Sequence, residues 1–163
     1  VRTFSLTTLN LGKSLKSIGE SSFTCIWKQF PRPMGDCNRL TTVRFPDTLV
    51  SIGARAFQEV KSLKAVYLPP SVTTIGESAF DQCSGLDSIQ FPESLVTIGE
   101  SAFENCTGLQ NITLPSKVTS VGVNAFAYSK NVKQLTVNTK SAFYGGGAFL
   151  NTSVGPSGTI LMT

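Results

Sequence analysis

Cysteine is the residue type in this sequence with the widest possible chemistry, because a thiol can react, bind a metal or form a disulfide. The sequence has four cysteines. Cys37, Cys83 and Cys106 each lie three residues before a leucine, and this shared spacing predicts a column of buried thiols that act as small apolar groups. Cys25 has a different spacing. Two interpretations stay open for it, namely a disulfide with Cys37 and a free thiol.

The sequence lacks the residue combinations of the common catalytic, metal-binding and phosphate-binding sites. The sequence contains no histidine, which excludes Ser–His and Cys–His catalysis and removes the commonest metal ligand. The glycines at 145–147 do not follow a strand in the way that a phosphate-binding loop requires, so we interpret them as a flexible turn. We therefore expect no enzyme activity, no cofactor and no metal.

Acidic residues gather in one part of the chain. Residues 65–116 carry six acids and no base: Glu77, Asp81, Asp87, Glu93, Glu100 and Glu104. These carboxylates do not alternate within one loop, as calcium ligands would, and we expect a solvated convex face. These six acids, which we call the acidic belt, also interrupt the basic stripe that a nucleic-acid-binding protein would need. We therefore expect no nucleic-acid partner, although the net charge is +4.

The elements that must position these residues come from an internal repeat. Gly53, Gly76, Gly99 and Gly122 lie 23 residues apart. Around them recur a leucine, an aliphatic residue three positions later, a proline, and an Ala-Phe pair. The repeats fall near 6–23, 40–57, 63–80, 86–103, 109–126 and 132–149, and the last of these is degraded. This period predicts a leucine-rich-repeat solenoid of about six coils that forms a single domain over residues 1–163.

Each repeated position has a physical reason. Val43 and Phe45 alternate with polar residues, which predicts a strand that turns both side chains inward. The following proline lacks an N–H group and ends the strand. Gly53 then supplies a turn that a residue with a Cβ would resist. A short second strand and a single helical turn, as at 78–80, complete the coil. Residues 157–163 could add a terminal edge strand.

The slot pattern LxxIxLPxxVxxIGxxAFxxC resembles the BspA-like leucine-rich-repeat family. Four repeats match closely and two loosely, so the resemblance covers most of the chain. It implies a right-handed solenoid with a parallel sheet on its concave face. It also implies a surface-exposed or secreted bacterial or protist protein that acts as an adhesin and binds host matrix proteins or other cells.

The first repeat contains an insertion at 24–35, which holds the only tryptophan. Insertions in repeat proteins map to loops on one face, and Trp and Arg are frequent in interaction hot spots. Trp27 and Arg32 are therefore candidate binding residues. The alternative is that Trp27 and Phe30 fold over the end of the solenoid as a cap.

The outward residues of the predicted long strands form the other candidate surface. They are small, polar and nearly uncharged, which suits an extended polar ligand. Arg44 and Tyr67 are the expected anchors, with Gln90 beside them. The remaining candidates on this surface are Thr42, Ser88, Asn111 and Thr113. A solvated sheet face with no partner stays open as the alternative.

The sequence thus predicts a non-enzymatic protein-recognition module at the cell surface, or secreted, that binds a protein through its concave sheet. A stalk or spacer in a larger surface protein and an intracellular scaffold are the alternatives. No apolar run approaches the length of about 20 residues that a transmembrane helix needs, so we expect no membrane insertion. Val1 begins no signal-peptide pattern, and we expect a processed or excised fragment. Both ends lack an obvious polar cap, so end-to-end association is a further expectation.

Overall fold

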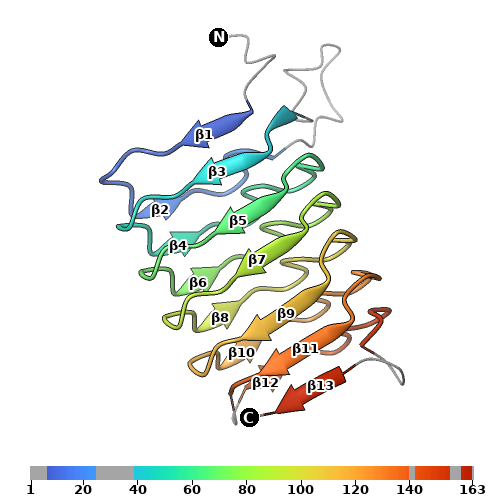
Figure 1. Ribbon diagram of the computed structural model, residues 1–163. Coiled ribbons are helices and arrows are strands. Elements are labelled where there is room, and N and C mark those ends of the chain that lie inside the picture. Colours follow the sequence, from blue (N-terminus) through green and yellow to red (C-terminus); the bar gives the residue numbers. More distant parts are fainter. Residues whose placement is uncertain (1–6, 25–38, 140–141, 155–158, 163) are drawn as a thin grey trace.

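The computed structural model describes residues 7–24, 39–139, 142–154 and 159–162. Within these ranges the chain winds into stacked coils, each with a long strand, a short strand and a turn segment (Figure 1). Paired residues of neighbouring coils from β3 to β12, such as Val43 and Val66, are 23 positions apart, whereas Leu9 and Val43 are 34 apart and Leu135 and Ile160 are 25 apart. The coils form a parallel β-solenoid, as the repeat predicts.

The long strands form what we call the first wall. They are β1 (Thr8–Asn10), β3 (Thr42–Arg44), β5 (Ala65–Tyr67), β7 (Ser88–Gln90), β9 (Asn111–Leu114), β11 (Gln134–Val137) and β13 (Thr159–Met162). All pairings are parallel, and β13 pairs with β11 at one end of the wall. Each proline after a long strand opens a turn: the carbonyl of Pro69, for example, accepts from Val72 N–H at 3.1 Å.

The short strands form the second wall, behind the first in Figure 1. They are β2 (Ser17–Ile18), β4 (Ser51–Ile52), β6 (Thr74–Ile75), β8 (Thr97–Ile98), β10 (Ser120–Val121) and β12 (Phe143–Tyr144). They make one continuous sheet of six strands. A single sheet therefore holds all the coils from β2 to β12 in register.

The first wall, in contrast, is not the one sheet that the sequence predicts. It divides into the sheet β1-β3-β5-β7 and the sheet β13-β11-β9, with no pairing between β7 and β9. The division lies beside Phe91, which fills a slot held by leucine in the coils before and after it, although Phe45 fills the same slot after β3, where the sheet is undivided. The Phe91 ring reaches both Phe103 and Phe126, at 5.5 and 6.3 Å between centroids, and so leans across the gap.

Stacked phenylalanines form the centre of the core. Neighbouring rings from Phe23 to Phe149 lie 5.1 to 5.4 Å apart and within 14° of parallel, in the order Phe23, Phe57, Phe80, Phe103, Phe126 and Phe149. Offset stacking of this kind adds to the free energy gained by burying the rings. The four middle rings are fully buried. Each coil is thus held mainly by its two neighbours.

The third side of the solenoid, which we call the turn wall, consists of residues 19–24, 53–60, 76–83, 99–106, 122–129 and 145–152. The single helical turns expected here are wrong in detail. Ser78 and Gln82 have positive φ angles of 50° and 58°, which interrupt a right-handed helix. The wall is instead a run of tight turns whose amides donate to the next coil, as Phe57 N–H does to the carbonyl of Ala79 at 2.8 Å.

The repeating glycines also serve a different purpose from the one expected. Gly53, Gly76, Gly99 and Gly122 have no positive φ, so they supply no special turn. A Cβ added at Gly122 would lie 2.4 Å from the backbone nitrogen of Glu100 in the preceding coil. Glycine is required at this slot because adjacent backbones approach closely.

Candidate binding surface

The first wall presents two rows of outward residues in the order that the sequence predicts. Arg44 pairs in register with Tyr67, and Tyr67 with Gln90. The neighbouring row runs from Thr42 through Ala65 to Ser88. These residues share one face because alternate side chains of a strand point the same way.

This face carries one large exposed aromatic ring. Tyr67 is 64% exposed, and Arg44 and Gln90 on either side of it are exposed as well. No hydrogen bond or ion pair between described residues engages the side chains of these three residues. The arginine, the phenol and the amide are therefore available together to a partner.

The other predicted residues are placed differently. Asn111 and Thr113 lie exposed on β9, beyond the division of the first wall, so they belong to a separate sheet from Arg44. Thr42 is half-buried. Trp27 and Arg32 lie outside the described residues, as do Cys25 and the Cys37 with which it could pair.

Cys83 and Cys106 form part of the predicted buried column, and both are free thiols. They do more than fill space. The Cys83 thiol donates to the carbonyl of Phe57, and the Cys106 thiol to that of Phe80, each at 3.1 Å. Ser129 occupies the same slot and donates to the carbonyl of Phe103 at 3.0 Å. Val60 fills this slot in the coil before Cys83 and has no side-chain donor, so the slot accepts a donor but does not require one.

Burial also makes these thiols unreactive. It raises the pKa of Cys83 and of Cys106 above the ordinary value of 9.0. A reactive or metal-binding cysteine needs the opposite shift, toward the thiolate. Among the described residues there is also no group of three His, Cys, Asp or Glu side chains that could hold a metal ion.

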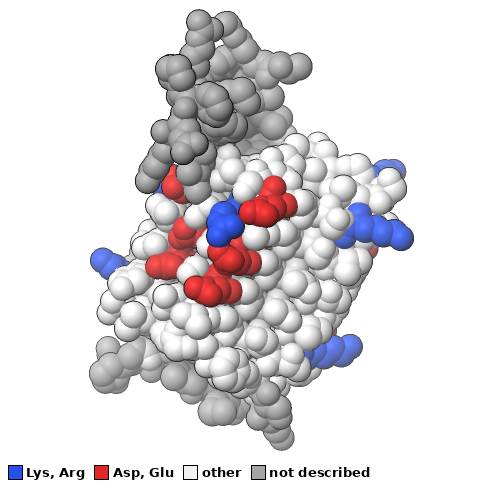
Figure 2. Space-filling model, turned by 180° about the vertical axis from the view of Figure 1, so that it is seen from behind, with Lys and Arg blue, Asp and Glu red and all other residues white. Residues whose placement is uncertain are grey.

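The acidic belt divides between different sides of the solenoid. Four of its members, Glu77, Asp81, Glu100 and Glu104, lie on the turn wall, and Figure 2 shows acids gathered around a basic residue on this side. Asp87 and Glu93 lie outside the turn wall. The expectation of a purely solvated face is wrong for Asp81, which is only 7% exposed.

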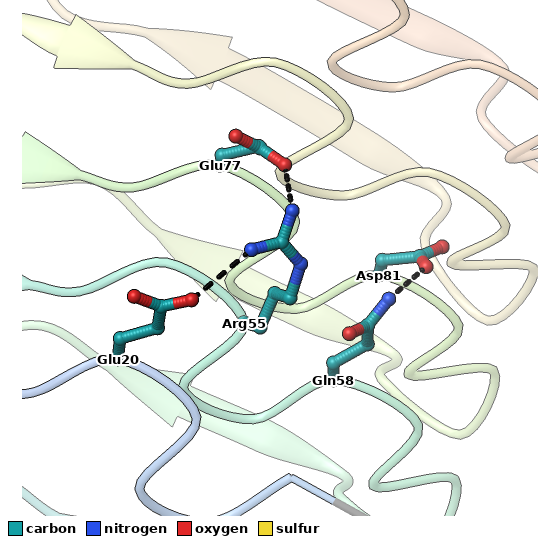
Figure 3. Close-up of polar contacts among 5 residues, drawn as sticks. All are labelled: Glu20, Arg55, Gln58, Glu77 and Asp81. Carbon is teal, nitrogen blue, oxygen red and sulfur yellow. Dashed lines mark hydrogen bonds and ion pairs between the residues drawn. The ribbon is translucent and has the colours of Figure 1, made fainter. Parts of the chain in front are cut away.

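Sequence reasoning missed the one base of the turn wall, Arg55. Its guanidinium Nη1 lies 3.2 Å from Glu20 Oε1, and its Nη2 pairs with Glu77 Oε1 (Figure 3). The signal was available, because Arg55 fills a slot held by Ser21 and Ser78 in the coils on either side.

The repeated slots and their stacking agree with the comparison to known families. The model of the BspA type leucine-rich repeat region matches residues 34–154 in six copies. The chain belongs to this family. BspA-type repeat proteins are typically found at the surface or secreted, and their repeats are generally non-catalytic modules that bind proteins.

Solved structures share the fold of this BspA-type protein. A T. pallidum leucine-rich repeat protein matches with a TM-score of 0.70 and 21% identity over 89% of this chain and 76% of that protein. A leucine-rich cell surface protein from Faecalibacterium prausnitzii matches with a TM-score of 0.68 and 24% identity over 97% of this chain. The chain spans 48% of the length of that second protein. No curated protein matches the chain.

No helix in the described part of this BspA-type chain is long and apolar enough to cross a membrane.

Proposed function

We propose that this protein is a cell-surface or secreted adhesin that binds a host matrix or cell-surface protein through its first wall. The observation that carries the proposal is the row of Arg44, Tyr67 and Gln90 on adjacent strands. Tyr and Arg supply large contact areas and directed hydrogen bonds, and they dominate interaction hot spots. A sheet fixed on both sides by stacked coils holds them at constant spacing, which lowers the entropy lost on binding.

The surface location rests on the family. BspA-type proteins are typically surface or secreted, and one of the fold neighbours is described as a cell surface protein. A location outside the cell would bring the exposed first wall within reach of matrix proteins.

The test is binding to a panel of purified extracellular-matrix proteins, measured by biolayer interferometry. The variant Arg44→Ala/Tyr67→Ala/Gln90→Ala removes the row, and Val50→Ala/Val96→Ala removes two exposed residues outside the first wall. We expect the triple variant to bind at least about tenfold more weakly and the control to bind as the wild type does. Melting temperatures of both variants should stay near that of the wild type, because all five side chains are exposed.

The other outcomes have defined meanings. Equal binding by the wild type and the triple variant would contradict recognition through this row. Failure of every panel member to bind would contradict the adhesin function and favour the spacer, which needs only the rigid stack of coils.

A further inference from the structure

The turn wall concentrates negative charge. Its six segments hold six acids, and Arg55 is their only base. The acids recur because they follow repeated residues: Glu20, Glu77 and Glu100 follow a glycine, and Asp81 and Glu104 follow a core phenylalanine, while Glu59 comes two residues after one. Since the coils stack in register, Glu20, Glu77 and Glu100 form one column and Asp81 and Glu104 a second, while Glu59 lies in the next slot, which Gln82 holds in the following coil. We call these six residues the acidic columns.

Arg55 shows how the acidic columns hold a guanidinium. It occupies a slot that is serine in the neighbouring coils, at a left-handed φ of 55°. There it spans Glu20 of the preceding coil and Glu77 of the following one. In the coil of Arg55 itself, Ala54 occupies the slot that Glu20 and Glu77 fill in the neighbouring coils. The arginine therefore lies between two glutamates, and its own coil contributes none at that slot.

Beyond Glu77 the columns continue without any base. Glu100 and Glu104 make no ion pair in the described part of the chain, where Arg55 makes the only two. Their coil carries Ser101 in the arginine slot, and the coil of Glu77 carries Ser78 there. The half of the wall from Glu77 to Glu104 therefore holds four acids, and Arg55, which pairs with Glu77, is the only base beside them on this wall.

Asp81, which is only 7% exposed, is a second and separate observation on this wall. Its Oδ2 accepts from Gln58 Nε2 at 2.9 Å and from Gln82 Nε2 at 3.4 Å. Its buried Oδ1 has no hydrogen-bond partner, and neither has the buried Oε1 of Gln58. Figure 3 shows this second oxygen turned away from Gln58. A buried carboxylate with no cation beside it is costly, and it adds to the negative potential of the surface above it.

We propose that the acidic columns from Glu77 to Glu104 bind an arginine-rich segment of a partner protein. One arginine of that segment lies across Glu77, Glu100 and Glu104, over the buried Asp81. A metal ion fits less well, because the described residues offer no group of three metal-binding side chains. Nucleic acid would be repelled by the same carboxylates. The site is separate from the first wall and independent of its function.

The overall charge of the protein makes the test informative. The chain carries a net charge of +4, so it repels a basic peptide as a whole. Attraction then has to come from a local group of acids. The guanidinium fork also favours arginine over lysine where two carboxylates are presented together.

The experiment is fluorescence anisotropy with a labelled peptide of arginine alternating with glycine and serine. A second peptide has citrulline, the uncharged isostere, at each arginine. Glu100→Gln/Glu104→Gln removes two charges from the columns, and Asp87→Asn/Glu93→Gln removes two charges elsewhere. We expect the arginine peptide to bind the wild type and the control variant with affinities within about twofold of each other, and the column variant about tenfold more weakly.

Arg55→Ser provides a variant with the opposite effect. It installs the serine of the neighbouring coils and frees Glu20 and Glu77, so the arginine peptide should bind more tightly by roughly two- to tenfold. The proposal is overturned if the wild type does not bind the peptide, if the two double variants weaken binding equally, or if the citrulline peptide binds as well. Binding to Arg55→Ser that is weaker than to the wild type would also overturn it.

Discussion

At the scale of single residues, the buried cysteines show how one slot can serve two purposes. Cys83 and Cys106 fill the core as small side chains, and their thiols donate to carbonyls of the preceding coil. Ser129 makes the same donation with a hydroxyl. Packing alone would explain a cysteine there but not a buried serine, so the donor role unites the three residues.

The buried thiols make stability depend on pH above the range where free thiols ionise. The pKa of both is raised by burial, so the folded protein keeps protons that the unfolded chain releases above about pH 9. Below that pH both thiols are protonated in the folded and in the unfolded chain, so they do not make stability depend on pH. Above it, we expect the free energy of unfolding to fall by up to about 1.4 kcal/mol per pH unit for each thiol.

The measurement is urea denaturation at about pH 8 and about pH 10, on either side of the ordinary thiol pKa. The matched variant Cys83→Ser/Cys106→Ser keeps a donor in the slot but does not titrate in this range. Its stability should fall less between the two pH values than that of the wild type. If the wild type and the variant lost equal stability between the two pH values, the two thiols would not be the cause of the pH dependence.

At the scale of the element, the close stacking of coils depends on the absence of a side chain at one repeated slot. A Cβ at Gly122 would lie 2.5 Å from the carbonyl carbon of Gly99, whereas one at Gly12 would meet nothing within 4 Å. We expect Gly122→Ala to destabilise the fold by about 1–3 kcal/mol and Gly12→Ala to change stability by less than about 0.5 kcal/mol. Thermal denaturation of the two variants is the measurement, and equal shifts in Tm would show that the contact between coils is not the cause.

The sequence predicted the elements of the coil because each has a strong local pattern. Alternation located the long strands, and the spacing of Phe80 and Phe103 located the core stack. The left-handed turns were missed, because residues with side chains, serine and asparagine most often, occupy nearly all of them, and Gly147 is the one glycine among the described positions. The division of the first wall was missed as well, since the repeat pattern does not mark it: Phe45 fills the same slot as Phe91, yet β3 pairs with β5.

The candidate surfaces were predictable to different degrees. The row of Arg44, Tyr67 and Gln90 follows from the strand alternation and the repeat period alone. The pairing of Arg55 with Glu20 and Glu77 depends on side-chain directions across three coils. The unpartnered oxygen of Asp81 depends on burial, which an acidic residue in a repeat does not reveal.

At the scale of the whole molecule, the stack of coils has an interior and an end. Phe103 is fully buried between two rings at 5.2 Å, and Phe91 contacts it as well. Phe149 is partly buried; among the described residues its ring stacks on that of Phe126 at 5.4 Å and contacts the tilted ring of Tyr144 at 6.1 Å. In a solenoid each coil is stabilised mainly by its neighbours, so equal substitutions at these two positions should have unequal effects.

We expect Phe103→Ala to lower the free energy of unfolding by about 3–5 kcal/mol and Phe149→Ala by about 1–2 kcal/mol. The two losses should also differ in extent along the chain. Hydrogen exchange measured by mass spectrometry should show faster exchange on both sides of Phe103 in the first variant. In the second, it should be confined to residues 142–154 and β13. Uniform acceleration in both variants would mean that the coils unfold as one cooperative unit, because a local loss at the end would then be shared by every coil.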